Sequence, residues 1–122
     1  MIQERLSFLP DTLPDYQPFP PARERTVWEA LPQRVKDRSL RAGEAALAQP
    51  IAPLPLSLWL DFIHTGRRTP WEDAYFSRRA RLCTLVCAEC VEHKGRFMDA
   101  ITDTVWAICE ESAWQLPAHN SY

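Results

Sequence analysis

The stretch TPWEDAYFSRRARLCTLVCAECVEHKG, residues 69–95, decides the fold. Thr69 and Glu72 have the spacing of a capping box, in which each side chain bonds the backbone N–H of the other residue. The proline between them suits the first turn of a helix, where its missing N–H costs nothing. The stretch therefore predicts a long helix that begins at Thr69, runs to about Lys94 and is stopped by Gly95.

Apolar side chains recur along this helix at intervals of three and four, which predicts one face turned toward a core. The expected stripe consists of Trp71, Tyr75, Leu82, Val86 and Cys90, widened by Phe76, Cys83 and Cys87. The polar residues Arg78, Arg79, Arg81, Glu89 and Glu92 fall largely on the other side. With Arg67 and Arg68, the arginines could attract an anionic polymer, but a solvated face that pairs with carboxylates is the simpler interpretation.

Shorter helices are predicted on both sides of this stretch, over residues 22–31, 33–49 and 96–112. A fourth has Pro55 in its first turn and is capped by Gly66; it is largely apolar, so we expect it to be buried. No segment alternates polar and apolar residues as a strand does. The sequence therefore predicts an all-α protein of antiparallel helical hairpins.

Five prolines interrupt the first 22 residues. Because proline removes a backbone donor and clashes with a preceding helical turn, residues 1–22 are predicted to form an irregular, proline-rich extended arm. Its apolar side chains favour an arm that lies on a helical surface. Residues 23–122 are predicted to form one helical domain.

Composition limits the classes of partner. The 122 residues carry 14 basic and 16 acidic side chains, so charge gives no reason to expect nucleic acid or an anionic membrane. No apolar run approaches the roughly 20 residues that span a bilayer. The N-terminus shows no secretory leader, which favours a cytoplasmic protein with reduced cysteines.

Cys83, Cys87 and Cys90 have the cysteine spacing of the radical SAM iron–sulfur motif. The same spacing places them on a single face of the predicted helix, where cysteine behaves as a small buried hydrophobe. A zinc site would draw on Cys87, Cys90, His93 and Cys109, but structural zinc prefers ligands from separate elements. We therefore expect no metal and no cofactor.

The C-terminal stretch, residues 106–122, is crowded with aromatic, acidic and imidazole groups. On a continuous helix Trp106, Glu110 and Trp114 would align on one side, because each lies four residues from the next. A carboxylate between two indoles can hold a sugar, whose apolar face stacks on the rings. Spacing alone favours the simpler interpretation, in which both tryptophans lie in the core and Glu110 and Glu111 are solvated.

The run WAICEESAWQLPAHN, residues 106–120, resembles a segment of the heparinase II/III-like polysaccharide lyases. The resemblance is specific over about residues 99–120 and absent from the proline-rich arm. It implies part of an N-terminal (α/α) toroid. It also implies β-elimination on uronic-acid-containing polysaccharides, in which a tyrosine or histidine base removes the proton beside the uronate carboxylate.

The resemblance implies a substrate cleft built from Glu110, Glu111, Trp114, His119 and Asn120. Glu111 and Trp114 would contact sugar, His119 and Asn120 would face the uronate, and His119 is a candidate base. Further hairpins and active-site residues would lie beyond Tyr122, so the chain is expected to be inactive alone and to self-associate through exposed helix faces. The alternative is a non-enzymatic helical module that binds a protein through a tryptophan-rich face.

Overall fold

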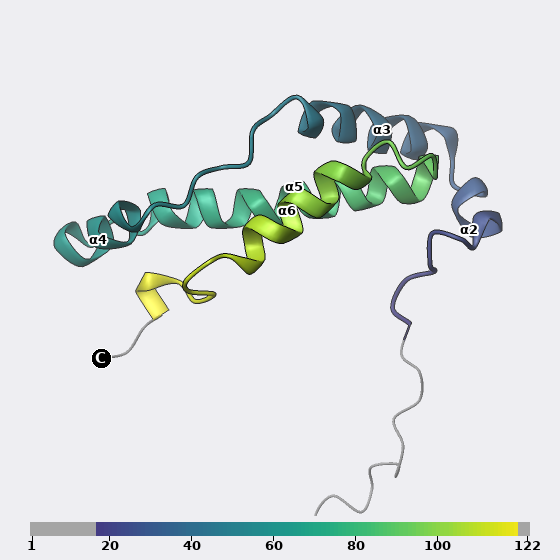
Figure 1. Cartoon of the computed structure of the whole chain (residues 1–122). Coiled ribbons are helices and arrows are strands. Elements are labelled where there is room, and N and C mark those ends of the chain that lie inside the picture. Colours follow the sequence, from purple (N-terminus) through teal and green to yellow (C-terminus); the bar gives the residue numbers. More distant parts are fainter. Residues whose placement is uncertain (1–16, 120–122) are drawn as a thin grey trace, which may run out of the picture.

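The computed structural model describes residues 17–119, and every regular element in that range is a helix (Figure 1). The all-α class is therefore confirmed for the described part of the chain. The elements are α2 (Arg25–Glu29), α3 (Gln33–Leu47), α4 (Leu56–Thr65), α5 (Thr69–Glu92), α6 (Met98–Cys109) and the 3-10 helix η1 (Pro117–His119). The expectations for residues 1–16 and for Asn120 lie outside this range.

Helix α5 is the axis of the fold, and α3 and α6 both run antiparallel to it (Figure 1). The contacts give the same directions. Glu89, near the end of α5, accepts a hydrogen bond from the N–H of Phe97, just before α6. Near the start of α5, the Arg78 side chain bonds the carbonyl of Ala107, at the end of α6. Helices α5 and α6 thus form the kind of antiparallel hairpin that the sequence predicts.

The core lies where α3, α5 and the start of α6 meet. Leu85, Ala88 and Phe97 are buried there, and Leu40 and Ile101 pack against them. Gly43 of α3 lies at the closest approach. A Cβ atom at this position would lie 2.9 Å from the Phe97 ring and would collide with Ala88. The glycine that weakens α3 by propensity is therefore what allows α3 to approach α5.

The predicted capping box at the start of α5 is wrong. Thr69 is already helical, the N-cap is Arg68, and no side chain caps the helix. Glu72 instead pairs with Arg68, with 3.1 Å between Oε1 and Nε. The N-cap is Arg68 rather than Thr69, so the reciprocal bonds of a capping box do not form. The ion pair between Arg68 and Glu72, one helical turn apart, is found in their place.

Helix α5 ends at Glu92, two residues before the predicted end. His93 takes the left-handed conformation, with φ of 56°, and its N–H donates to the carbonyl of Glu89. The buried Glu89 carboxylate then accepts the N–H groups of Gly95, at 2.7 Å, and of Phe97, at 3.1 Å. The expectation that Glu89 faces solvent is therefore wrong: this side chain builds the connection between α5 and α6.

The predicted apolar face of α5 is only partly correct. Trp71 and Tyr75 are buried, but the buried positions further along are Leu85 and Ala88. Phe76 and Val86 are exposed, and so are Cys83 and Cys87, which were expected in the core; Cys90 is half-buried.

Arginines occupy the core-facing side of α5, where they bond backbone carbonyls at the end of α3 and in the connector that follows it. Arg78 donates to the carbonyl of Ala52, and Arg81 donates to those of Ala46 and Gln49. The last carbonyls of a helix have no partner within it, so a guanidinium with five donors can satisfy several at once. These arginines therefore do not lie on the solvent-facing side that the hydrophobic pattern of α5 predicts.

Helix α4 is not buried, contrary to expectation. Gly66 caps it in the left-handed conformation, as predicted, but Leu56 is 69% exposed and no residue of the helix is fully buried. The helix contacts α5, where Trp59 packs against Trp71, and it also contacts η1.

Helix α6 ends at Cys109 rather than at Ser112. Trp114 therefore does not continue the helical face that carries Trp106, and the predicted alignment of two indoles about Glu110 does not form. Both tryptophans are exposed, Trp106 by 66% and Trp114 by 64%, so neither belongs to the core.

Candidate functional site

A pocket of about 400 Å³ lies between α4, the first turns of α5 and the segment that follows α6. These three elements meet because Gly66 reverses the chain after α4 and α6 returns antiparallel along α5. The pocket is lined by Leu54, Leu56, Trp59, Trp71, Arg78, Ala107, Glu110, Glu111, Ser112 and Ala113.

Two tryptophans from consecutive helices form the aromatic side of the pocket. The ring centroids of Trp59 and Trp71 are 5.0 Å apart and their planes meet at 86°, an edge-to-face pair. Trp71 is only 5% exposed, and its indole N–H has no acceptor among the described residues. Buried donors are almost always paired, so this N–H is an exception among the described residues.

Glu111 forms the charged floor of the pocket. Its side chain is 1% exposed. Its Oε2 lies 2.6 Å from Nη2 of Arg79, and its Oε1 lies 3.2 Å from Nη1 of Arg78. Both oxygens are thus occupied by arginines, so Glu111 holds the segment after α6 against α5.

Glu110 is the exposed carboxylate at the pocket. It is the C-cap of α6, and its backbone N–H donates to the carbonyl of Trp106. Within residues 17–119 its side chain has no hydrogen bond and no ion pair. Of the two adjacent acids, Glu110 is therefore the one that can accept hydrogen bonds from a ligand.

Tyr75 fixes the segment that carries Trp114. Its hydroxyl donates to the carbonyl of Trp114 at 2.9 Å, and the Arg79 guanidinium stacks on the Tyr75 ring. The Trp114 side chain is exposed and does not line the pocket.

His119 lies in η1 and is exposed, outside the residues that line the pocket. The structure therefore brings Glu110 and Glu111 together, and it does not bring Trp114 or His119 into the pocket with them. Asn120, the remaining predicted site residue, lies outside the described range.

Sequence reasoning did not assign Trp59, Trp71 and Arg78 to the site. A signal for the two tryptophans was present: they lie 12 residues apart on either side of the Gly66 turn, so a helical hairpin would bring them together. The position of Arg78 had no such signal, because it depends on carbonyls contributed by residues 52 and 107.

Chemically, the pocket offers an aromatic face, an unpaired N–H donor and an exposed carboxylate. Among residues 17–119, its lining contains no histidine or tyrosine that could remove a proton. Within residues 17–119, no three histidine, cysteine or acidic side chains cluster to hold a metal ion, and no helix is long and apolar enough to cross a membrane. In the comparisons with known proteins, no family model and no curated sequence matches the chain.

Proposed function

We propose that the pocket between α4, α5 and the end of α6 binds a carbohydrate. A sugar presents an apolar face that stacks on an aromatic ring and hydroxyl groups that both donate and accept. Trp59 supplies the ring, Glu110 an acceptor, and Trp71 a donor. The volume of about 400 Å³ lies within the usual range for small-ligand sites.

The observation that carries the proposal is the indole N–H of Trp71. It is buried and has no acceptor in the described part of the chain, in a pocket that also holds an exposed carboxylate. Leaving such a donor unpaired costs about 1–3 kcal/mol, which a ligand oxygen in the pocket would recover.

We further propose that this pocket is one wall of a polysaccharide lyase cleft, within a partial (α/α) toroid. Support comes from the resemblance of residues 106–120 to the heparinase II/III-like lyases, which act by β-elimination on uronides. The segment that carries this resemblance contributes Glu110 and Glu111 to the pocket. The described residues of the pocket lining include no histidine or tyrosine base, and we expect the chain alone to bind uronides without cleaving them.

Isothermal titration calorimetry with a uronic-acid tetrasaccharide tests the proposal, with a neutral glucose tetrasaccharide as comparison. Trp71→Phe removes the N–H and keeps an aromatic ring, and Glu110→Gln removes the exposed charge. Each change should weaken binding about tenfold, which corresponds to roughly 1.4 kcal/mol. Trp28→Phe on α2 is the matched control, since the Trp28 N–H is already bonded to the carbonyl of Pro21. Equal affinity in all variants, or no binding by the unaltered chain, would overturn the proposal.

A second candidate function is a non-enzymatic helical interaction module. It is favoured because more large apolar side chains are exposed than buried among the described residues. Among the described residues only five hydrophobic side chains are buried, whereas thirteen large ones are exposed. Exposed apolar side chains that lie together on one helix are typical of surfaces that a polypeptide covers. Met98, Val105 and Trp106 of α6 form one such surface, and we assign it to a second copy of the chain.

Sedimentation equilibrium distinguishes this candidate from the carbohydrate site. Val105→Gln with Trp106→Gln should shift a dimer toward monomer without changing tetrasaccharide binding, because neither residue lines the pocket. A chain that is monomeric at all concentrations would exclude the second copy as the partner.

A further inference from the structure

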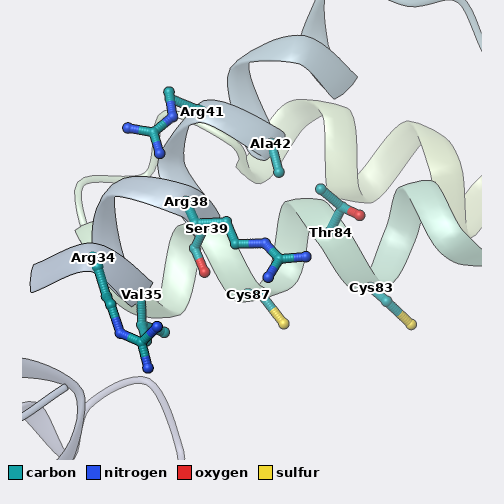
Figure 2. A pocket seen from close by; sticks show the side chains of 9 residues that line it. All are labelled: Arg34, Val35, Arg38, Ser39, Arg41, Ala42, Cys83, Thr84 and Cys87. Carbon is teal, nitrogen blue, oxygen red and sulfur yellow. The ribbon is translucent and has the colours of Figure 1, made fainter. Parts of the chain in front are cut away.

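A second hollow, of about 650 Å³, lies between α3 and α5 (Figure 2). Helix α3 contributes three arginines, Arg34, Arg38 and Arg41, and α5 contributes two thiols, Cys83 and Cys87. Figure 2 shows the Arg38 guanidinium reaching across toward α5, with the two sulfur atoms on the same side of that helix. No residue of this hollow belongs to the candidate carbohydrate pocket.

The hollow is positively charged. The three arginines recur at intervals of four and three residues, so they lie along one face of α3. None of them has a hydrogen bond or an ion pair within residues 17–119. The two acids of α3 are engaged elsewhere: Asp37 accepts from Gln33, and Glu44 pairs with Arg96. Unpaired guanidinium groups in a concave site favour a ligand that carries carboxylates.

Cys83 and Cys87 are the accessible thiols of this helix. Both are exposed. Reactive cysteines characteristically lie in electropositive, accessible surroundings, because the nucleophile is the thiolate. Cys90 differs from them: it is half-buried, and burial raises the pKa of its thiol. Cys109, exposed on α6 beside Glu110, provides a thiol outside the hollow.

We propose that this hollow is an S-thiolation site, at which Cys83 and Cys87 exchange with small disulfides that carry carboxylate groups. The arginines bind the carboxylates and hold the disulfide bond beside the thiols. The hollow shares no residue with the carbohydrate pocket or with the surface formed by Met98, Val105 and Trp106, so the inference is independent of the proposed function.

The exchange is balanced without any further oxidant. A cysteine thiol first loses its proton to water, and its thiolate attacks one sulfur of the small disulfide. A protein–ligand S–S bond forms, the original S–S bond breaks, and the second half of the reagent leaves as a thiolate that takes up a proton. The disulfide reagent is thereby reduced and the cysteine is oxidised.

The mixed disulfide is expected to persist. Cβ atoms one helical turn apart lie about 5–6 Å from each other, whereas a disulfide needs about 3.5–4.5 Å. While α5 remains helical, Cys83 therefore cannot expel the ligand from Cys87 by forming an internal disulfide. The carboxylates of the bound group stay against the arginines, which reverses part of the local charge.

The test compares a dianionic disulfide, 5,5′-dithiobis(2-nitrobenzoate), with the neutral 4,4′-dithiodipyridine on the full chain. Mass spectrometry of the peptides gives the rate at each cysteine. The ratio of anionic to neutral rate should be at least about fivefold higher at Cys83 and Cys87 than at Cys109, since charged clefts raise association rates by about 10–1,000-fold. In 1 M salt, where the Debye length is about 3 Å, the rate ratio at Cys83 and Cys87 should fall to about that at Cys109, so this excess should approach unity.

Arginine variants test whether the arginines of the hollow cause the higher ratio of anionic to neutral rate at Cys83 and Cys87. Arg38→Gln with Arg41→Gln should abolish the excess, and Arg38→Lys with Arg41→Lys should retain most of it. Arg23→Gln with Lys94→Gln makes the same change in net charge at exposed positions outside the hollow and should leave the excess unchanged. Oxidised glutathione, a carboxylate-bearing tripeptide disulfide, should then label Cys83 or Cys87 before Cys109. Two results would overturn the proposal. One is an equal ratio of anionic to neutral rate at Cys83, Cys87 and Cys109; the other is a higher ratio at Cys83 and Cys87 that persists in the variant with Arg38→Gln and Arg41→Gln.

Discussion

The carboxylate of Glu111 is held against the guanidinium of Arg79, with 2.6 Å between Oε2 and Nη2. Arg78 reaches the other carboxylate oxygen at 3.2 Å, and the glutamate side chain is 1% exposed. This ion pair joins the segment after α6 to the middle of α5. It places the neighbouring Glu110 at the rim of the pocket.

Glu111→Gln should destabilise the protein by about 2–4 kcal/mol, because it leaves two partly buried guanidinium groups without their counter-charge. Urea unfolding measures the change. Glu110→Gln, next to it but exposed, should change the free energy of unfolding by no more than about 0.5 kcal/mol. Equal effects of the two substitutions would contradict the burial of Glu111.

Gly43→Ala should destabilise the protein by about 1–2 kcal/mol, although alanine is the better helix former. The added methyl would overlap Ala88 and lie 2.9 Å from the Phe97 ring, and overpacking of this kind costs about 1–3 kcal/mol. Ala45→Gly, at an exposed position of α3, should cost about 1 kcal/mol through propensity alone. Thermal unfolding measures the change in stability of both variants. A gain in stability for Gly43→Ala would show that α3 does not pack closely against α5.

Glu89→Ala should cost about 3 kcal/mol, because the backbone N–H groups of Gly95 and Phe97 would lose a charged acceptor in a buried site. Glu92→Ala, three residues later, is the control. Its pair with Arg96 is partly exposed and should contribute less than about 1 kcal/mol. If the two alanine variants unfold at the same denaturant concentration, the assigned role of Glu89 is wrong.

The hydrogen bond from Arg96 lowers the pKa of Glu92 below its ordinary 4.5. Because the folded-state pKa lies below the unfolded value, the interaction stabilises the protein above about pH 4.5. That contribution is lost as the pH falls through the folded-state pKa. Carboxyl titration by NMR should therefore give Glu92 a midpoint below 4.5, and Arg96→Gln should move it back up. A midpoint unaffected by Arg96→Gln would contradict the pairing.

The helical class, the long α5 and the Gly66 turn could be predicted from the sequence because they depend on local signals. Periodicity and helix-stopping residues act within a few positions of where they stand. The orientation of α5 could not be predicted in the same way. It depends on Arg78 and Arg81 reaching carbonyls that lie 26 or more residues away, and hydrophobic pattern assigns those arginines to solvent.

The candidate site was predictable only in part for a related reason. Glu110 and Glu111 stand out as an adjacent acidic pair, but their division into one exposed and one enclosed carboxylate follows from Arg78 and Arg79. The predicted alignment of Trp106 with Trp114 assumed a helix that continues past Cys109. Because α6 ends there, the tryptophans that line the pocket with Glu110 are Trp59 and Trp71, from two other helices.

The N–H of Trp71 gives the most direct test of the carbohydrate site. In ¹H–¹⁵N spectra of the chain, the indole resonance of Trp71, assigned through Trp71→Phe, should move downfield as a uronic-acid tetrasaccharide is added, because the donor gains an acceptor. The indole resonance of Trp28, already bonded to Pro21, should stay in place. A Trp71 resonance that remains unchanged at saturating tetrasaccharide would contradict the account.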